Sequence, residues 1–227
     1  MRVLILWDVD HTLVENAGVS KEIYAAAFEA AARMKPLHPA RTEGRTDRLI
    51  MQGMFEDHGL QMPPWDDVAQ ALARAGAARG GAMKSRGSVL PGVSEAICAL
   101  AEDGLYVQSV LTGNIRPNAE MKVSTVGLRG LNFDIGAYGD DADDRAELVA
   151  IAQHRAQQLL GEPFDVRNTV LIGDTPRDVD AALRGGARVV AVATGVHSAD
   201  ELAAAGASDV MRTLADTARL KAYLSPR

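Results

Sequence analysis

The sequence has a single cysteine, Cys98, among its 227 residues, and one cysteine cannot form an internal disulfide. A chain without disulfides is typical of a reducing compartment. Cys98 lies in the apolar stretch from Ala96 to Leu100. We therefore expect a buried, unreactive thiol rather than a catalytic nucleophile.

Long hydrophobic runs are also missing. The first apolar run, from Val3 to Trp7, is shorter than the core of a signal peptide and ends at Asp8. No later run approaches the length needed to cross a bilayer. The sequence therefore predicts a soluble, cytoplasmic protein with no membrane partner.

Positive charge is in deficit. The chain has 24 Lys and Arg against 30 Asp and Glu, which gives a net charge of -6. This balance argues against nucleic acid as a partner, and a small anionic substrate would need a local cation or a metal ion to be held. The composition, 47% hydrophobic and 24% charged, is that of a globular protein. The length allows one domain that carries a smaller module.

Continuous apolar runs predict buried parallel strands, because strands covered on both faces do not alternate with polar residues. The four runs are Arg2–Trp7, Leu105–Leu111, Thr169–Ile172 and Arg188–Ala193, with a weaker fifth at Phe133–Tyr138. Helical periodicity lies between them, for example at Leu148, Ile151 and Leu159. The alternation predicts an α/β fold with a doubly wound, mainly parallel, Rossmann-like sheet.

The first two predicted strands are nearly a hundred residues apart, whereas a simple βαβ unit needs roughly 30. The intervening segment has helical patterns at 19–34 and 49–54, and a third from Trp65 to about Met83 after Pro63–Pro64. Pro91 then marks the start of the next core helix. We predict an all-helical cap domain at 15–87, inserted into a core domain formed by 1–14 and 88–227.

Polar residues follow three of the strands. Asp8 and Asp10 follow the first, Thr112, Gly113 and Asn114 follow the second, and Asp174 and Asp178 follow the fourth. Ligands of open α/β sheets bind just beyond the carboxyl ends of the strands. Taken singly, each group is more typical of a turn or a helix cap. Together, at three strand ends, they predict one functional site.

Four carboxylates at one sheet edge repel one another, and two unit charges about 4 Å apart cost roughly 4 kcal/mol at an effective dielectric near 20. Such a cluster persists with a cation or with some carboxyls protonated. Hard oxygen ligands suit Mg²⁺, which is commonly coordinated by protein carboxylates and substrate phosphate together. Thr112 and Gly113 offer a hydroxyl and an N–H before a helix that we expect to begin near Asn114, and a helix N-terminus of this kind binds anions.

These motifs resemble those of the haloacid dehalogenase-like hydrolases, and specifically the phosphoglycolate phosphatase-like branch with a helical cap after the first motif. The resemblance covers essentially the whole chain. The matching segments are Leu4–Leu13, which contains Asp8-Val9-Asp10-His11-Thr12, the strand end at Thr112, Gly173–Asp178, Gly44–Asp47 and Leu90–Val93. Many relatives have glycine at the position of His11.

The resemblance implies a role for each matching residue. Asp8 would be the nucleophile that forms an aspartyl-phosphate, and Asp10 the general acid and base. Mg²⁺ would be held by the Asp8 carboxylate, the Asp10 carbonyl and Asp174, with Asp178 behind them. Thr112 would belong to the catalytic group. Contacts to the substrate or its phosphate would come from Thr12, Gly113, Asn114 and Arg45.

The third motif of the family is commonly a lysine after the third strand. The corresponding segment here, 140–145, ends in Arg145, which we predict to balance Asp8 and the phosphoryl group. An alternative is pairing of Arg145 with a neighbouring aspartate. Lys122 is ten residues after Thr112, about 15 Å along a helix that starts there. We expect Lys122 to be a solvated surface residue.

The sequence therefore predicts a magnesium-dependent phosphatase for a small phosphorylated metabolite, as a monomer or a homodimer. The 2-haloacid dehalogenases share the fold but lack the second carboxylate, so Asp10 favours phosphoryl transfer, in which an alkoxide needs a proton. A phosphosugar mutase of the same superfamily would retain both aspartates. A third reading is a binding module that accepts phosphate at Asp8 without turnover, which the large helical insertion disfavours.

Overall fold

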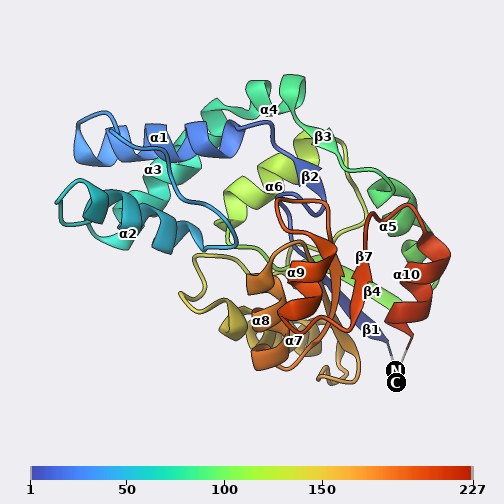
Figure 1. The fold of residues 1–227 in the computed structure, drawn as a ribbon. Helices are drawn as coiled ribbons and strands as arrows, with labels where there is room; N and C mark the ends of the chain where they lie inside the picture. Colours follow the sequence, from blue (N-terminus) through green and yellow to red (C-terminus); the bar gives the residue numbers. More distant parts are fainter. Residues whose placement is uncertain (1, 226–227) are drawn as a thin grey trace.

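The computed structural model describes residues 2–225, and its centre is a parallel sheet with helices on both faces (Figure 1). The strands lie in the order β4-β1-β5-β6-β7. They are β1 (Val3–Trp7), β4 (Tyr106–Val110), β5 (Thr169–Gly173), β6 (Arg188–Val192) and β7 (Asp209–Met211). The predicted doubly wound α/β sheet and its four principal strands are confirmed.

The central strand β1 shows why these strands are continuously apolar. Val3, Ile5 and Trp7 pack into the hydrophobic cluster on one face of the sheet. Leu4 and Leu6 pack into the cluster on the other face. All five side chains are fully buried, and each contributes roughly 1.5–3 kcal/mol relative to exposure.

Two groups of helices cover the two faces. On the face of Trp7 the cluster draws on α5 (Val93–Ala101), α6 (Arg116–Thr125) and α10 (Thr217–Leu224). On the face of Leu6 it draws on α7 (Arg145–Leu160), α8 (Pro176–Gly185) and α9 (Ala199–Ala204).

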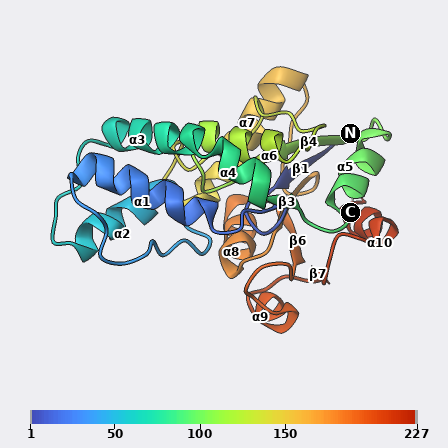
Figure 2. The same ribbon diagram turned by 90° about the horizontal axis from the view of Figure 1, so that it is seen from above.

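The remaining helices lie between β1 and β4 in sequence and extend away from the sheet (Figures 1 and 2). They are α1 (Val19–Ala32), α2 (Asp47–Asp57), α3 (Trp65–Ala78) and α4 (Gly80–Arg86). Two short strands, β2 (Val14–Glu15) and β3 (Ser88–Val89), pair antiparallel at the two ends of this segment. The chain therefore leaves and rejoins the sheet through two adjacent connections. We call α1–α4 the helical insertion.

Some elements differ from the sequence-based expectations. Phe133–Tyr138 is a turn with a single bridge between Leu111 and Ala137, because the Gly136 N–H donates to the carbonyl of Phe133 rather than to a neighbouring strand. The three-residue β7 was not predicted from its short pattern. The single helix expected from Trp65 to Met83 is two helices, α3 and α4.

Cys98 is exposed, so the expectation of a buried thiol was wrong. The buried positions of α5 are Val93, Ala96, Ile97 and Leu100. This spacing leaves residue 98 on the opposite face of the helix.

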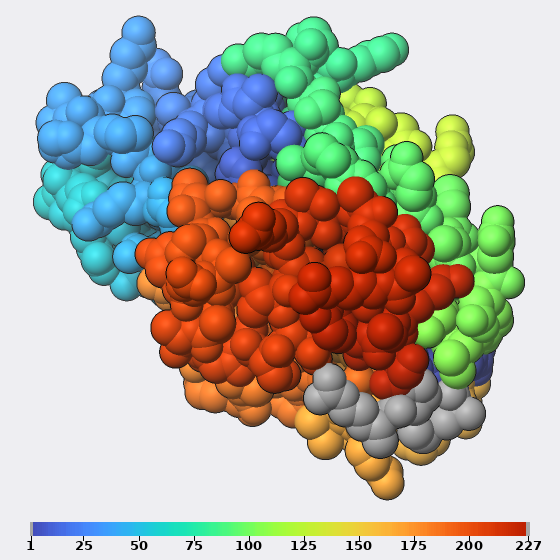
Figure 3. Space-filling model, turned by 45° about the vertical axis from the view of Figure 1, so that its right-hand side comes forward, coloured from blue at the N-terminus to red at the C-terminus, as the bar shows by residue number. Residues whose placement is uncertain are grey.

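The surface of the helical insertion, coloured blue to cyan, lies directly against the orange surface of the C-terminal half (Figure 3). Across residues 2–225, none of the helices has the length and apolar character needed to cross a membrane.

Candidate active site

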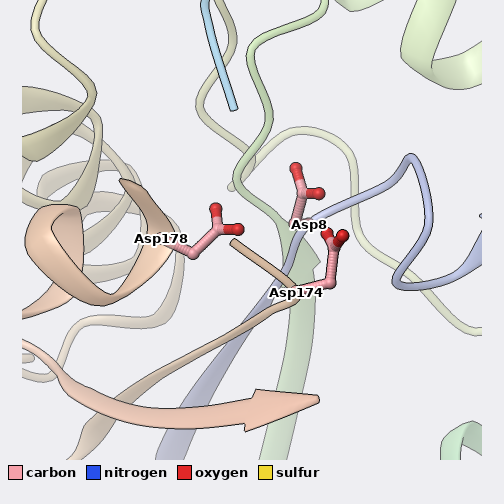
Figure 4. Close-up of side chains that lie close together, drawn as sticks. All are labelled: Asp8, Asp174 and Asp178. Carbon is pink, nitrogen blue, oxygen red and sulfur yellow. The ribbon is translucent and has the colours of Figure 1, made fainter. Parts of the chain in front are cut away.

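Asp8 and Asp174 lie side by side because their strands are neighbours. Trp7 of β1 pairs with Ile172 of β5, and the Asp8 N–H donates to the Ile172 carbonyl at 2.8 Å. Each aspartate therefore leaves the sheet at the same edge. Asp178, from the first turn of α8, is the third member of the group (Figure 4). One carboxylate oxygen from each of the three residues lies within 4.8 Å of the others.

The start of α8 holds Asp178 in this position. Thr175 is the N-cap residue, and its hydroxyl accepts the Asp178 N–H while Asp178 Oδ2 accepts the Thr175 N–H at 3.0 Å. This reciprocal capping box and Pro176 in the first turn are typical helix-start features. A side chain at Gly173 would overlap Asp178, since its Cβ would lie 2.4 Å from Asp178 Cγ. The close approach requires glycine.

Arg145 joins the three carboxylates from the first residue of α7. Its Nη2 donates to Asp8 Oδ1 at 2.7 Å and also to Asp178 Oδ1. Arg145 is nine-tenths buried. The structure therefore brings Arg145 to the carboxylates, as the sequence predicted, and not to the aspartates that precede it.

Arg145 pairs with two of the three carboxylates, Asp8 and Asp178, and not with Asp174. Burial raises the pKa of Asp8 to about 7 despite Arg145, and Asp178 adds to the rise. Burial and the neighbouring carboxylates Asp178 and Asp8 raise the pKa of Asp174 to about 9. Three carboxylates at this spacing could hold a metal ion.

Asp10 is separate from this group and is held by other donors. The donors are Lys122 Nζ, at 2.9 Å from Oδ1 and 2.7 Å from Oδ2, Asn114 Nδ2, Asn16 Nδ2 and Ser20 Oγ. Burial opposes ionisation of Asp10, but Lys122 and the hydrogen bonds outweigh it and lower its pKa to about 2. The Asp10 carboxylate is therefore kept in its ionised form.

The expectation for Lys122 was wrong. Only 1% of its side chain is exposed, and its ammonium contacts Asp10 and Asn114. The helix α6 begins at Arg116, so Lys122 is six residues and about 9 Å from the helix start. Side chains in a helix lean toward its N-terminus, which brings the ammonium back to the strand ends.

The loop from Thr112 to Asn114 follows β4, with Thr112 fully buried. Thr112 Oγ1 accepts the Asn114 N–H at 3.3 Å and the Asn114 Nδ2 at 2.7 Å. The expected helix start near Asn114 is displaced to Arg116. At the start of α6, the Ile115 N–H donates to Asp47 Oδ2 at 2.9 Å. A carboxylate of the protein thus binds to the helix N-terminus that was expected to bind phosphate.

Asp47 links the helical insertion to the sheet. Its N–H donates to the Gly113 carbonyl at 2.7 Å, and its Oδ1 accepts the Tyr24 hydroxyl at 2.7 Å. A Cβ at Gly113 would lie 2.1 Å from the Arg45 carbonyl oxygen. The segment from Gly44 to Asp47 therefore packs on the backbone of the 112–114 loop, with no room for a side chain.

A cavity of about 300 Å³ lies between the carboxylates and the helical insertion. Its lining includes most of the predicted site residues, namely Asp8, Asp10, Arg45, Thr112, Gly113, Asn114, Arg145 and Asp174. Lys21, Tyr24 and Glu43 of the insertion also line it. Across residues 2–225, neither Arg45 nor Lys21 forms an ion pair with an acidic side chain.

Thr12 and His11, which are neighbours in the first motif, differ in their relation to the cavity. Thr12 does not line the cavity; it is fully buried and donates to Asp174 Oδ1 at 3.2 Å. His11 does line the cavity, and its ring contacts Glu15 at 3.1 Å. The φ angle of His11 is 61°, in the left-handed region where glycine is favoured.

Sequence reasoning missed Lys122, Asp47, Asn16 and Ser20. Asp47 lies in the matching segment Gly44–Asp47 but was given no role there, and the other three residues lie in no matching segment; the four come from different elements that meet only in the folded chain. Arg116–Pro117 is a typical helix start. A helix that begins there places Lys122 closer to the strand ends than one that begins at Asn114.

Comparisons with known proteins agree with this geometry. Residues 147–217 match the family model described as HAD-hydrolase-like. The probable phosphatase IndB of Dickeya dadantii (strain 3937) is 28% identical over 225 residues, which cover 95% of this chain and 92% of that protein. A hydrolase from Pseudomonas syringae has a similar structure, with a TM-score of 0.72 and 21% identity over 99% of this chain and 100% of that one.

A further structural neighbour is CbbY from Rhodobacter sphaeroides, solved in complex with phosphate. Its TM-score is 0.68, with 21% identity over 97% of this chain and 100% of that one. The matched family segment, the relative that spans the chain and the shared fold make this chain similar to the haloacid dehalogenase-like hydrolases.

Proposed function

We propose that this chain is a magnesium-dependent phosphatase that hydrolyses a small phosphate monoester through an aspartyl-phosphate on Asp8. The observation that carries the proposal is the group of Asp8, Asp174 and Asp178 at the edge of the cavity, with Arg145 bound to Asp8. IndB and CbbY, the relatives described above, support a phosphate ester as substrate, because one is named a probable phosphatase and the other binds phosphate.

In the first step, the Asp8 carboxylate attacks phosphorus, and the ester oxygen leaves with its electron pair and takes the proton that Asp10 carries from the preceding turnover. Arg145, which donates to Asp8, is placed to bind an oxygen of the transferring phosphoryl group. The Thr112 hydroxyl accepts two hydrogen bonds, so its own proton is available for a phosphoryl oxygen. These groups bind and orient the phosphate, which is most of what phosphoryl transfer requires.

In the second step, water attacks the aspartyl-phosphate and gives its proton to Asp10. The ionised Asp10 of this structure is the form that accepts that proton. After the transfer Asp10 carries the proton that the next leaving group needs. Asp10 lines the cavity, so both exchanges occur on the side from which the leaving group departs.

Asp8, Asp174 and the Asp10 carbonyl would hold Mg²⁺, with Asp178 behind them. When bound, the ion neutralises the carboxylates and the substrate phosphate and orients the phosphoryl group. The raised pKa values of Asp8 and Asp174 support this assignment, because a bound cation would offset the burial and the mutual repulsion that raise them.

We propose that residues 15–87 act as the cap domain on a core formed by 1–14 and 88–227. Arg45 and Lys21 reach the cavity from this segment. A cap in this position would exclude water from the transferring phosphoryl group and contact the leaving group.

Release of phosphate from p-nitrophenyl phosphate, with Mg²⁺ and with EDTA, tests the proposal. We expect release with Mg²⁺ only, and no release by Asp8→Asn. An Mg²⁺-saturated protein that binds phosphate but never releases it from an ester would be a binding module. A panel of small phosphate esters then identifies the substrate class.

A further inference from the structure

Lys122 is a buried cation that does not reach the cavity. Its side chain is 1% exposed, and it is absent from the cavity lining, whereas Asp10 and Asn114 both line it. Its ammonium makes three hydrogen bonds, two to the oxygens of Asp10 and one to Asn114 Oδ1 at 2.6 Å. An ammonium has three donors, so Lys122 has none left for a substrate.

The same contacts fix the orientation of the Asn114 amide. Since Lys122 donates to Oδ1, the Nδ2 group must face the other way, and it donates to Asp10 Oδ2 at 2.8 Å. Lys122 therefore holds Asp10 directly and also through Asn114. Both tethers come from α6 and the loop before it, on the sheet side of the cavity.

Asn16 and Ser20 hold Asp10 from the other side. Asn16 Nδ2 lies 2.7 Å from Asp10 Oδ1 and Ser20 Oγ lies 3.2 Å from it. These residues belong to the connection into the helical insertion and to the first turn of α1. Without Lys122, Asp10 would keep its partners on the insertion side and lose the one charged partner that it has among residues 2–225.

We infer that Lys122 is a positioning residue that holds the Asp10 carboxylate at the leaving-group side of the cavity. It acts through Asp10 and Asn114 and touches neither the phosphate nor the leaving group. The inference rests on the proposed function, because it concerns the proton exchange assigned to Asp10.

In a buried ion pair that only stabilises the fold, we would expect both side chains to be shielded from the cavity. The Asp10 side chain is 23% exposed, against 1% for Lys122. Asp10 lines the cavity, whereas Lys122, its charged donor, does not. This asymmetry is what a proton-exchanging group requires.

The first experiment compares Lys122→Met with wild type on two esters. An alkyl phosphate has a leaving group that needs a proton, whereas p-nitrophenolate leaves without one. We expect kcat/KM to fall by about 100-fold or more on the alkyl ester, the usual contribution of general acid–base catalysis, and by only several-fold on p-nitrophenyl phosphate. Lys84→Met, at an exposed lysine of α4, is the matched control and should leave both rates unchanged.

The second experiment repeats the substitution in the Asp10→Asn background. If Lys122 acts through Asp10, the two losses on the alkyl ester will not multiply, and the double variant will resemble Asp10→Asn alone. Multiplying losses would overturn the inference, as would equal losses by Lys122→Met on the two esters or no loss on either.

Folding is checked by thermal unfolding of each variant. If Lys122→Met does not fold, Lys122→Gln, which retains an N–H donor, is compared on the same two esters with the same criteria. Wild type that releases no phosphate from either ester would refute the proposed function itself. Wild type that is active while the variants lose both esters equally would refute only the role of Lys122.

Discussion

The Nη2 atom of Arg145 lies 2.7 Å from Oδ1 of Asp8, although 137 positions separate the two residues in sequence. The contact forms because β1 ends at Trp7 and α7 begins at Arg145 on the same edge of the sheet. The guanidinium also donates to Asp178. One arginine therefore links the proposed nucleophile to the carboxylate behind it.

Removing this guanidinium should weaken catalysis more than folding. We expect Arg145→Ala to lower kcat/KM by an amount that corresponds to about 2–4 kcal/mol of activation free energy. This is similar to the loss of one preorganised electrostatic contact. Steady-state kinetics on p-nitrophenyl phosphate measure the effect. Arg167→Ala is the control, because Arg167 is exposed and pairs with Asp165 on the surface. Equal activity of the two variants would show that Arg145 does not contribute to catalysis.

Metal removal should abolish activity, because a dianionic phosphate would otherwise approach Asp8 and Asp174 without a compensating divalent charge. We expect EDTA to stop phosphate release and Mg²⁺ to restore it. Ca²⁺ should substitute poorly, since it prefers more ligands at longer distances. Full activity after exhaustive dialysis against EDTA would contradict the assignment.

Arg45 should affect substrate choice rather than chemistry. Arg45 lines the cavity from the helical insertion, where a guanidinium can bind a carboxylate or a hydroxyl of the leaving group. Arg45→Ala should reduce kcat/KM on the best ester of the panel far more than on p-nitrophenyl phosphate, which offers the insertion little to hold. Equal losses on both, or none on either, would make Arg45 structural.

Asp47 should make stability depend on pH. Burial raises its pKa from 3.8 to about 6, although hydrogen bonds from Ile115 and Tyr24 oppose the rise. Its protonated form is favoured in the folded state, so its contribution is fully present below about pH 4 and is lost as the pH rises through about 6. One pKa unit corresponds to about 1.4 kcal/mol.

Urea unfolding of wild type and Asp47→Asn at several pH values measures this effect. We expect the stability of wild type relative to the variant to fall by about 2 kcal/mol between pH 4 and pH 7. A difference that does not change with pH would show that Asp47 has an ordinary pKa in the folded protein.

The sheet and the residues at its edge could be predicted from the sequence because both depend on local patterns. Continuous apolar runs identify strands such as β1 and β5, and parallel pairing then brings Asp8 beside Asp174. The prediction for Arg145 came from the resemblance to the third motif of the family, together with its place at the start of a predicted helix. The inference for Asp8 and Asp174 needs only the order of the elements.

Lys122 and Asp47 could not be found in this way. The error for Lys122 came from counting α6 from Asn114 rather than Arg116 and from ignoring the tilt of helical side chains toward the N-terminus. Asp47 reaches Ile115 only because the helical insertion packs on the 112–114 loop. That packing depends on how two separate groups of elements fit together, which no local pattern reveals.

The stereochemical course at phosphorus tests the covalent mechanism most directly. A thiophosphate monoester made chiral with oxygen isotopes is hydrolysed in isotopically labelled water, and the configuration of the released thiophosphate is determined. Attack by Asp8 followed by attack of water is two in-line displacements, so we predict retention of configuration, and no product from Asp8→Asn. Inversion would mean a single direct attack by water and would contradict an aspartyl-phosphate on Asp8.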